Sequence, residues 1–297
     1  MTEPRRGGLG LWRRGRRVWR PREGLLVLPA LVFYILVYLY PLTRLLAWSF
    51  FDPGPTLKFY GALLAEPAYL KALSNTLEIS VAATVLSLVL GYPLAYLMAT
   101  SGARARSLLM ALILIPFWTS ILVRSFAWIV ILGNNGIVNR TLLSLGLVSR
   151  PAKLLFDMTG VQIGMVHVLL PFMVFPLYGV MSRIDPNLLR VARSLGAPPR
   201  RAFAKVFLPL SLPGVAAGCV LVFLLAIGFY VTPALLGGAG EITLATMIDM
   251  MVNTLLNWGF AATLGVVLLA VVGVIFVLFS RLLGLHRLTA VGEEGAR

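Results

Sequence analysis

The stretch DPNLLRVARSLGAPPRRAFAKVFLPLSLPG, residues 185–214, is a polar interval between two apolar stretches that are each long enough to cross a bilayer. Asp185 followed by Pro186 predicts a helix start, because aspartate accepts hydrogen bonds from unpaired amides and a proline at the first helical position has no amide to satisfy. Gly196 can end this helix in the left-handed conformation, and Pro198 and Pro199 can begin a second short helix. We therefore expect a compact helix-turn-helix at the membrane surface.

The first of these helices is expected to have an apolar side. Four apolar residues recur along it at helical spacing: Leu188, Leu189, Ala192 and Leu195. The basic residues of the interval are explained equally well as signals of membrane orientation and as contacts to a partner. They are Arg183, Arg190, Arg193, Arg200, Arg201 and Lys205.

The composition predicts an all-α integral membrane protein, since 59% of the residues are hydrophobic and only 12% are charged. A spanning helix needs roughly 20 mostly apolar residues. Six charge-free runs fit this requirement: 25–43, 79–100, 107–123, 158–182, 206–240 and 250–280. We expect the third span to continue to about Leu132 and the fifth to begin near Pro213, because prolines suit a bent entry better than a helix interior.

The domains expected are a basic tail (1–24), a six-span membrane domain (25–280, with the polar loop at 183–213) and a second tail (281–297).

The basic residues predict the orientation of the chain. If both termini are cytoplasmic, the inner loops and tails hold 19 Lys and Arg and the outer loops hold 5. The net charge of +15 is then mostly an inner-surface signal. No soluble domain presents a basic face, so a nucleic-acid partner is not expected.

The sequence contains no signature of catalysis or metal binding. A G-x4-G-K-[ST] phosphate loop is absent, so we do not expect this chain to hydrolyse ATP. His167 and His286 are far apart and lack a metal-ligand spacing, and the single cysteine, Cys219, cannot form a disulfide within the chain. We expect no catalytic residues, no metal site and no cofactor.

The fourth expected span suggests a translocation pathway. Pro171 and Pro176 each leave a carbonyl without its helical partner, and such carbonyls need a polar neighbour or a water-lined cavity. The same span carries Gln162 and His167, which lies near mid-membrane by rise per residue. The alternative is a kinked packing helix with a hydrogen-bonded core histidine.

Charged residues near the outer ends of the spans suggest an entrance to such a pathway. Glu78 and Arg124 are expected at comparable depth, and Arg44 and Asp249 close to the same level. They could line an entrance or pair with one another. The alternative is that each side chain reaches out to the membrane interface.

The polar interval resembles the cytoplasmic loop of ATP-binding-cassette (ABC) importer permeases, whose pattern is E-A-A-x3-G-x9-I-x-L-P. The matching positions are Ala192, Gly196, Val206, Leu208 and Pro209, whereas Arg190 and Val191 replace the Glu and the first Ala. Three further segments resemble the spermidine/putrescine branch, B or H type: IPFWTSILVRSFAWIVILGNNGIVN from Ile115, HVLLPFMVFPLYGVM from His167 and FYVTPALLGG from Phe229.

This resemblance implies a type I ABC importer permease (MetI-like) fold with a cytoplasmic coupling helix, in the bacterial inner membrane. It implies that the chain transports its cargo by alternating access. The partners it implies are a second permease, a cytoplasmic ABC ATPase dimer that binds ATP and Mg, and an external solute-binding protein. The coupling residues it implies are Leu188, Leu189, Ala192, Leu195, Gly196, Val206, Leu208 and Pro209. The leading cargo is a polyamine. The alternative function is an ion-coupled carrier or a channel without an ATPase partner.

Overall fold

The computed structural model describes residues 27–51 and 54–282. The chain divides into two units, Met1–Ala47 and Trp48–Arg297, which we describe separately. Among the described residues, six helices are long and apolar enough to cross a membrane, as predicted. They are Leu28–Ala47, Pro67–Thr100, Ile121–Ser144, Met158–Met181, Pro199–Ile227 and Trp258–Phe279.

The first unit contains one apolar helical run made of α2 (Leu28–Tyr34), the π-helical turn η1 (Ile35–Leu39) and α3 (Tyr40–Ala47). Pro41 accounts for the widened turn, because its ring would collide with the carbonyl four residues earlier. The amide of Tyr40 instead bonds the carbonyl of Ile35. The run extends beyond the predicted end at residue 43. The predicted tail 1–24 and residues 283–297 of the second tail lie outside the described residues.

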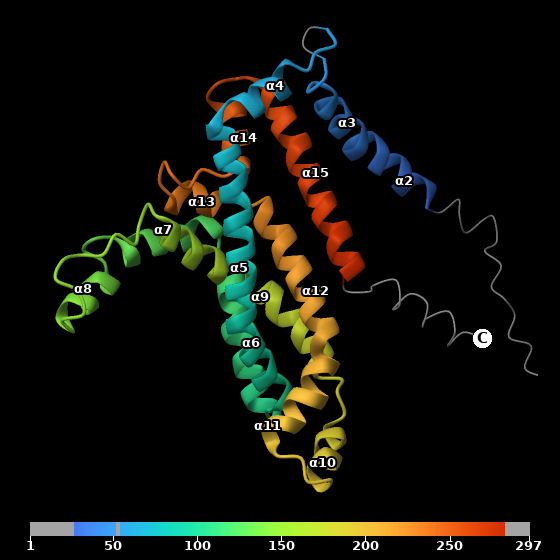
Figure 1. Ribbon diagram of the computed structural model, residues 1–297, viewed down its shortest axis with the longest axis vertical. Helices are drawn as coiled ribbons and strands as arrows, with labels where there is room; N and C mark the ends of the chain where they lie inside the picture. Colours follow the sequence, from blue (N-terminus) through green and yellow to red (C-terminus); the bar gives the residue numbers. More distant parts are fainter. Residues whose placement is uncertain (1–26, 52–53, 283–297) are drawn as a thin grey trace, which may run out of the picture. The chain divides into compact units, whose positions relative to one another are not determined.

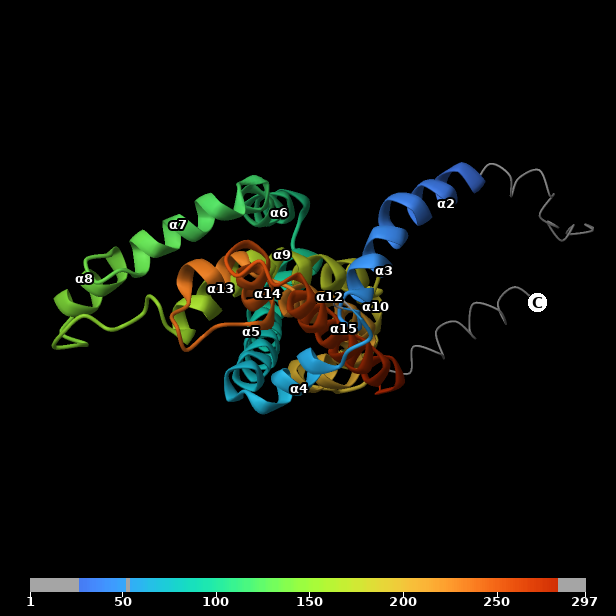
Figure 2. The same ribbon diagram turned by 90° about the horizontal axis from the view of Figure 1, so that it is seen from above.

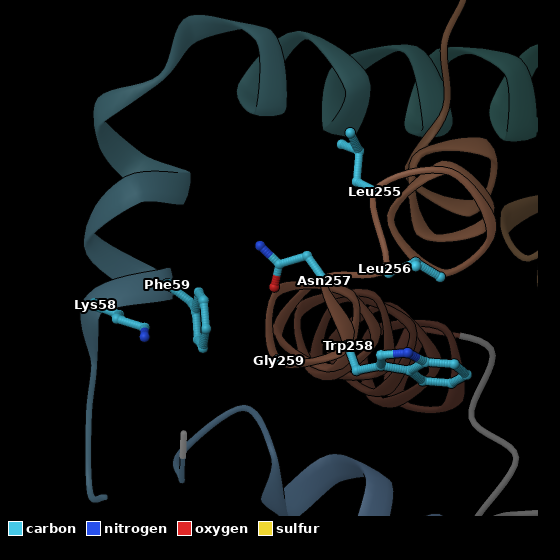
Figure 3. A pocket seen from close by; sticks show the side chains of 7 residues that line it. All are labelled: Lys58, Phe59, Leu255, Leu256, Asn257, Trp258 and Gly259. Carbon is cyan, nitrogen blue, oxygen red and sulfur yellow. The ribbon is translucent and has the colours of Figure 1, made fainter. Parts of the chain in front are cut away.

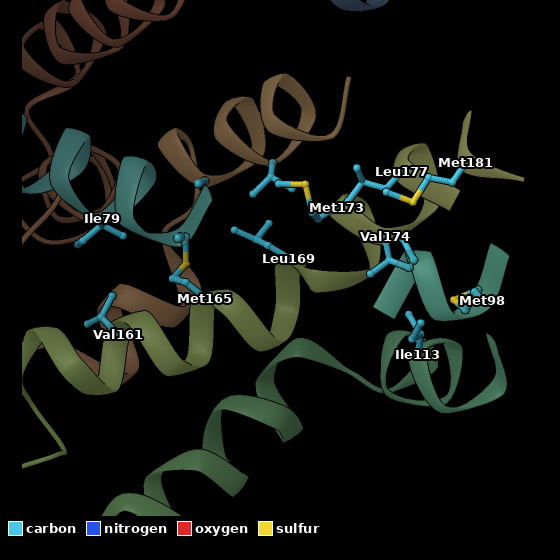
Figure 4. Packing of buried hydrophobic residues seen from close by; sticks show 14 of the residues in the cluster. Ile79, Met98, Ile113, Val161, Met165, Leu169, Met173, Val174, Leu177 and Met181 are labelled. Atoms are coloured by element: carbon cyan, nitrogen blue, oxygen red, sulfur yellow. The ribbon is translucent and has the colours of Figure 1, made fainter. Parts of the chain in front are cut away.

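Three long helices form the core of the second unit: α5 (Pro67–Thr100), α9 (Met158–Met181) and α12 (Leu208–Ile227) (Figure 1). Fully buried side chains recur every four residues along α9, and Figure 4 shows how they pack with residues of the neighbouring helices. They are Met165, Leu169, Met173, Leu177 and Met181. Between membrane-spanning helices such side chains stabilise the packed state through close van der Waals contact, because lipid is as apolar as the protein interior.

Shorter helices surround this core. α4 (Lys58–Ala65) precedes α5, and α6 (Ala103–Trp118), α7 (Ile121–Leu132) and α8 (Ile137–Ser144) follow it. α10 (Pro186–Ser194), α11 (Pro199–Ala202) and the π-helical turn η2 (Phe203–Phe207) connect α9 to α12. α13 (Val231–Leu236) and α14 (Leu244–Asn253) lead to α15 (Trp258–Leu282). α10 and α11 lie at one end of α5 and α12, and α4 and α14 lie at the other (Figure 1).

The bounds of the third predicted span are wrong. The chain breaks between α6 and α7 at Thr119 and Ser120, both extended, instead of forming one helix to Leu132. The Thr119 hydroxyl donates to the carbonyl of Pro116 at 2.6 Å, a local bond that competes with the helical ladder. The helix long enough to span begins after this break, at Ile121. α7 then extends beside α13, as Figures 1 and 2 both show.

The fifth and sixth predicted spans also have different bounds. The fifth does not begin near Pro213: one continuous helix runs from Pro199 to Ile227, and α13 is separate from it. The widened turn η2 lets the helix pass Pro209, as η1 does before Pro41. The sixth begins at Trp258, because residues 250–253 belong to α14 and Leu256, at φ +52°, turns the chain between the two helices. The second span is longer than predicted and begins at Pro67.

Candidate functional site

α10 has a defined cap at each end. The Asp185 carboxylate accepts a hydrogen bond from the amide of Asn187 at 2.9 Å, and Pro186 occupies the first turn. At the other end Gly196 has φ +84°, and its amide donates to the carbonyl of Arg193 at 2.9 Å. The Ala197 amide donates to the carbonyl of Ala192 at 3.1 Å, which completes the glycine-ended cap predicted from the sequence. The predicted helix-turn-helix is therefore present, and α11 begins at Pro199 as expected.

One side of α10 presents an apolar stripe that no described residue covers. Leu188, Val191 and Leu195 are 45%, 55% and 82% exposed. Leu189 points the other way and packs against the core, and Ala192 is half-buried. Val191 was missed because it replaces an alanine of the family pattern, although its spacing of three residues from Leu188 places it on this stripe.

The rest of the loop is joined rigidly to the core. Val206 is half-buried in η2, while Leu208 and Pro209 begin α12 and are exposed. The Ser211 hydroxyl donates to the carbonyl of Leu208 at 2.8 Å and lies 2.8 Å from the Tyr92 hydroxyl of α5. These bonds tie the start of α12 to α5.

His167 makes a specific contact with α7. The Trp128 indole N–H donates to His167 Nδ1 at 3.0 Å, and the two rings meet edge-on. An indole nitrogen is only a donor, so Nδ1 carries no proton in this arrangement. Arg124 lies one helical turn before Trp128 on the same side of α7. The structure thus brings Arg124, Trp128 and His167 to the packed boundary of α7 and α9. Sequence analysis missed Trp128, which only its spacing from Arg124 could have indicated.

The remaining predicted pathway residues do not gather at this boundary. Gln162 of α9 faces α5, where its amide donates to the carbonyl of Ile79 at 3.4 Å. Pro171 is buried within an unbroken α9. Glu78 lies on the exposed side of α5, and Asp249 of α14 accepts a hydrogen bond from Asn253 at 2.7 Å.

The predicted pairing of charged residues is not seen. Within residues 27–51 and 54–282, Glu78, Arg124 and Asp249 form no ion pair with one another. Among the predicted pathway residues, buried polar atoms without a hydrogen-bond partner in the described part of the chain remain at Arg124 Nε and Nη1 and at Gln162 Oε1. Such atoms are costly in a packed interior.

The sequence of residues 91–286 matches the model of the family "Binding-protein-dependent transport system inner membrane component". The chain belongs to this family. The permease is 38% identical over 226 residues to the spermidine/putrescine transport system permease protein PotB of Escherichia coli K12, an alignment that covers 76% of this chain and 82% of that protein. It shows the same identity to PotB of Salmonella typhimurium SL1344, with 78% of that protein covered. It is 33% identical to the inner membrane ABC transporter permease protein YdcU of E. coli K12, with 73% and 75% covered.

The fold of the permease is similar to that of a solved bacterial ABC transporter that imports the acidic polysaccharide alginate. The TM-score is 0.74 at 20% identity, with 88% of this chain and 96% of that chain covered. The same transporter in complex with an alginate pentasaccharide-bound periplasmic protein gives a TM-score of 0.73. The expected ABC importer permease fold is therefore confirmed, and the chain is a multi-pass inner-membrane permease subunit of a binding-protein-dependent importer.

At the other end of the permease from α10, a cavity of about 510 Å³ opens between α4 and the start of α15 (Figure 3). It is lined by Lys58, Phe59, Leu255, Leu256, Asn257, Trp258 and Gly259. None of the predicted coupling or pathway residues lines this cavity, so it is separate from both regions described above.

Proposed function

We propose that this permease imports a polyamine such as spermidine or putrescine. The observation that carries the proposal is 38% identity, over 76% of the chain, to permeases of spermidine/putrescine transport systems. The alginate importers share the fold at 20% identity, and their cargo therefore says nothing about the cargo of this chain.

The permease is proposed to work with a second, related permease, a pair of cytoplasmic ATPases and an external solute-binding protein. ATP and Mg²⁺ bind to the ATPases, and this chain holds no cofactor. ATP binding draws the ATPases together, and the exposed stripe Leu188–Val191–Leu195 follows one of them. The capped α10 and the continuous helix from Pro199 to Ile227 then carry this movement into the core, which alternates between outward-open and inward-open states.

The pathway is proposed to run along α9, with His167 and Arg124 at its boundary with α7, Gln162 on its α5 side and Pro171 within the helix. Glu78 and Asp249 are proposed to lie at its entrance. What supports this is Gln162 Oε1, a buried acceptor without a partner, to which the ammonium group of a polyamine could donate. The donor nitrogens of Arg124 need an acceptor instead, which water or the second permease could supply.

The test is uptake into proteoliposomes that contain the permease and the partners that co-purify with it. With external binding protein and internal ATP, we expect saturable uptake of radiolabelled spermidine that putrescine competes and vanadate abolishes. Uptake that persists in vanadate would favour an ion-coupled carrier. ATP-driven uptake of another solute, without polyamine uptake, would refute the cargo and leave the importer intact.

A further inference from the structure

A second cavity lies beside α10, on the side away from the exposed apolar stripe. It has a volume of about 310 Å³, within the range of roughly 300–1,000 Å³ that small-molecule sites occupy. Its walls come from the last turns of α5, from α10, from α11 and from η2: Tyr96, Leu189, Arg193, Pro199, Arg200 and Phe203. The proposed coupling mechanism uses the opposite side of α10 and leaves this cavity without a role.

The cavity is positively charged and contains no acid. Arg193 and Arg200 both line it, and neither forms an ion pair within the described part of the chain. The surrounding segments, 101–106 and 183–207, contain eight Lys and Arg and one acid, Asp185, whose carboxylate already caps α10. Two like charges around one cavity repel each other, and a bound anion would relieve this repulsion.

Aromatic residues build the floor of the cavity. The Tyr96 ring meets Phe203 edge-on with centroids 5.5 Å apart, and it meets Phe207 in the same way at 5.0 Å. This packing fixes the ring four residues before the end of α5. Tyrosine supplies a phenol that can donate a hydrogen bond to an anionic oxygen, and it favours the layer where a membrane meets water.

The side of α5 that carries Tyr96 also carries exposed apolar residues further from the cavity, which we call the apolar track. Val85 and Val89 lie eleven and seven residues before Tyr96, spacings that place all three on one side of a helix. Val85 is 52% exposed and Val89 is 60% exposed. A molecule with an anionic head in the cavity could therefore lay an apolar tail along a spanning helix.

We propose that this cavity binds the phosphate group of an acidic phospholipid, with Arg193 and Arg200 on the phosphate, Tyr96 beside it and an acyl chain along Val85 and Val89. Basic pockets between membrane helices recognise acidic headgroups by the same chemistry. Guanidinium groups suit phosphate oxygens because they can donate two parallel hydrogen bonds. If both termini are cytoplasmic, as the basic residues predict, this lipid belongs to the inner leaflet. The binding chemistry does not depend on that orientation.

The charge of the cavity fits a free phosphate as well as a lipid, and the apolar track favours the lipid.

The test uses native mass spectrometry of the purified, delipidated transporter complex. The probes are phosphatidylglycerol, phosphatidylcholine with the same acyl chains, and inorganic phosphate. We expect phosphatidylglycerol to bind about tenfold more tightly than phosphatidylcholine, because both lipids carry the phosphate but Arg193 and Arg200 repel the choline cation of the second.

Matched variants locate the site. R193Q/R200Q removes both charges from the cavity, and R190Q/R201Q removes the same charge from the same two helices outside it. We expect the first pair to lose the preference for phosphatidylglycerol and the second to keep it. All four side chains are exposed, so unchanged melting temperatures would confirm intact folding.

Three outcomes would overturn the proposal. Equal losses in both pairs would mean that diffuse surface charge attracts the lipid. Binding of inorganic phosphate without a preference for phosphatidylglycerol would mean that the ligand is a soluble anion. Binding to the isolated chain that disappears in the complete complex would mean that a partner protein covers this side of the permease.

Discussion

Gly196 determines the shape of the turn that follows α10. Its φ of +84° is one that residues with a side chain rarely adopt, although nothing lies within 4 Å of an added Cβ. A substitution at this position therefore acts through the backbone conformation, and through any charge that it places next to the exposed stripe. Asparagine tolerates this conformation better than most residues.

We expect Gly196→Asp to remain inserted in the membrane and to abolish ATP-driven uptake, because it places a negative charge beside Leu195. Gly196→Asn is the control: it has nearly the same shape without the charge, and we expect it to keep most of the uptake. Both variants would be compared at equal membrane levels. Normal uptake by the Asp variant would argue against a coupling role for this turn.

The role of the His167 side chain can be tested separately from the role of the hydrogen bond that it accepts from Trp128. Trp128→Phe removes the indole donor and keeps the imidazole, whereas His167→Ala removes both the bond and the ring. Loss of the bond should lower the free energy of unfolding by about 1–2 kcal/mol in both variants. If His167 lies on the pathway, uptake should fall further in His167→Ala. Equal uptake by the two variants would assign His167 a packing role only.

At the scale of elements, α9 touches α13 through a glycine. A Cβ added at Gly164 would lie 2.6 Å from the Thr232 Cγ2 atom, closer than packed atoms can approach. We expect Gly164→Ala to push the two helices apart and to lower stability by about 1–3 kcal/mol. Gly179→Ala is the control on the same helix, since nothing lies within 4 Å of its Cβ and alanine favours helix. Thermal unfolding in detergent would compare them, and equal melting temperatures would contradict this packing.

Local features of the elements could be predicted from the sequence, and features that depend on distant contacts could not. The caps of α10 were predictable because Asp185, Pro186 and Gly196 act within one or two turns. The break at Thr119 was not predictable, because it depends on a hydroxyl that leaves no mark in the hydropathy pattern. Likewise, nothing local indicates that Asn75 of α5 donates hydrogen bonds to the carbonyls of Gly240 and Ile242, some 165 residues away.

The candidate site shows the same division. Of the apolar side predicted for α10, Leu188 and Leu195 lie on the exposed stripe. Leu189 turns inward and Ala192 is half-buried, because their directions depend on the neighbouring helices. The pathway residues were selected by type and depth, and the structure separates Gln162 and Glu78 from His167 because helix rotation decides which side each faces. Depth in the membrane alone cannot predict that rotation.

At the scale of the whole molecule, the exposed stripe predicts the site of ATPase attachment. Leu195 is 82% exposed, so Leu195→Asp disturbs no internal packing. We expect this variant to lose the co-purifying ATPase and all ATP-driven uptake. Leu195→Met keeps an apolar side chain of similar size at the same position and should keep both. Retention of the ATPase by Leu195→Asp would place the contact elsewhere.

The distribution of basic residues predicts the orientation of the permease. With 19 Lys and Arg on the tails and loops assigned to the inside, both termini should be cytoplasmic. A green fluorescent protein fused to the carboxyl terminus should fluoresce, and an alkaline phosphatase fused at the same place should be inactive. The reverse pattern would invert the proposed orientation and the leaflet assigned to the lipid.

The widened turn η2 makes the geometry of this permease sensitive to chain length. It lies between α11 and α12 within one continuous helix and makes a longer-range bond than an ordinary helical turn, from Leu208 back to Phe203. Because a π-helical turn holds one residue more than an α-helical turn, loss of one codon among residues 203–207 would close η2 to a regular turn. This change would keep α10 in register with α12 and set the Pro209 ring against the carbonyl four residues earlier. An in-frame deletion of three nucleotides there would thus leave the stripe facing the same way and kink the helix at Pro209 instead.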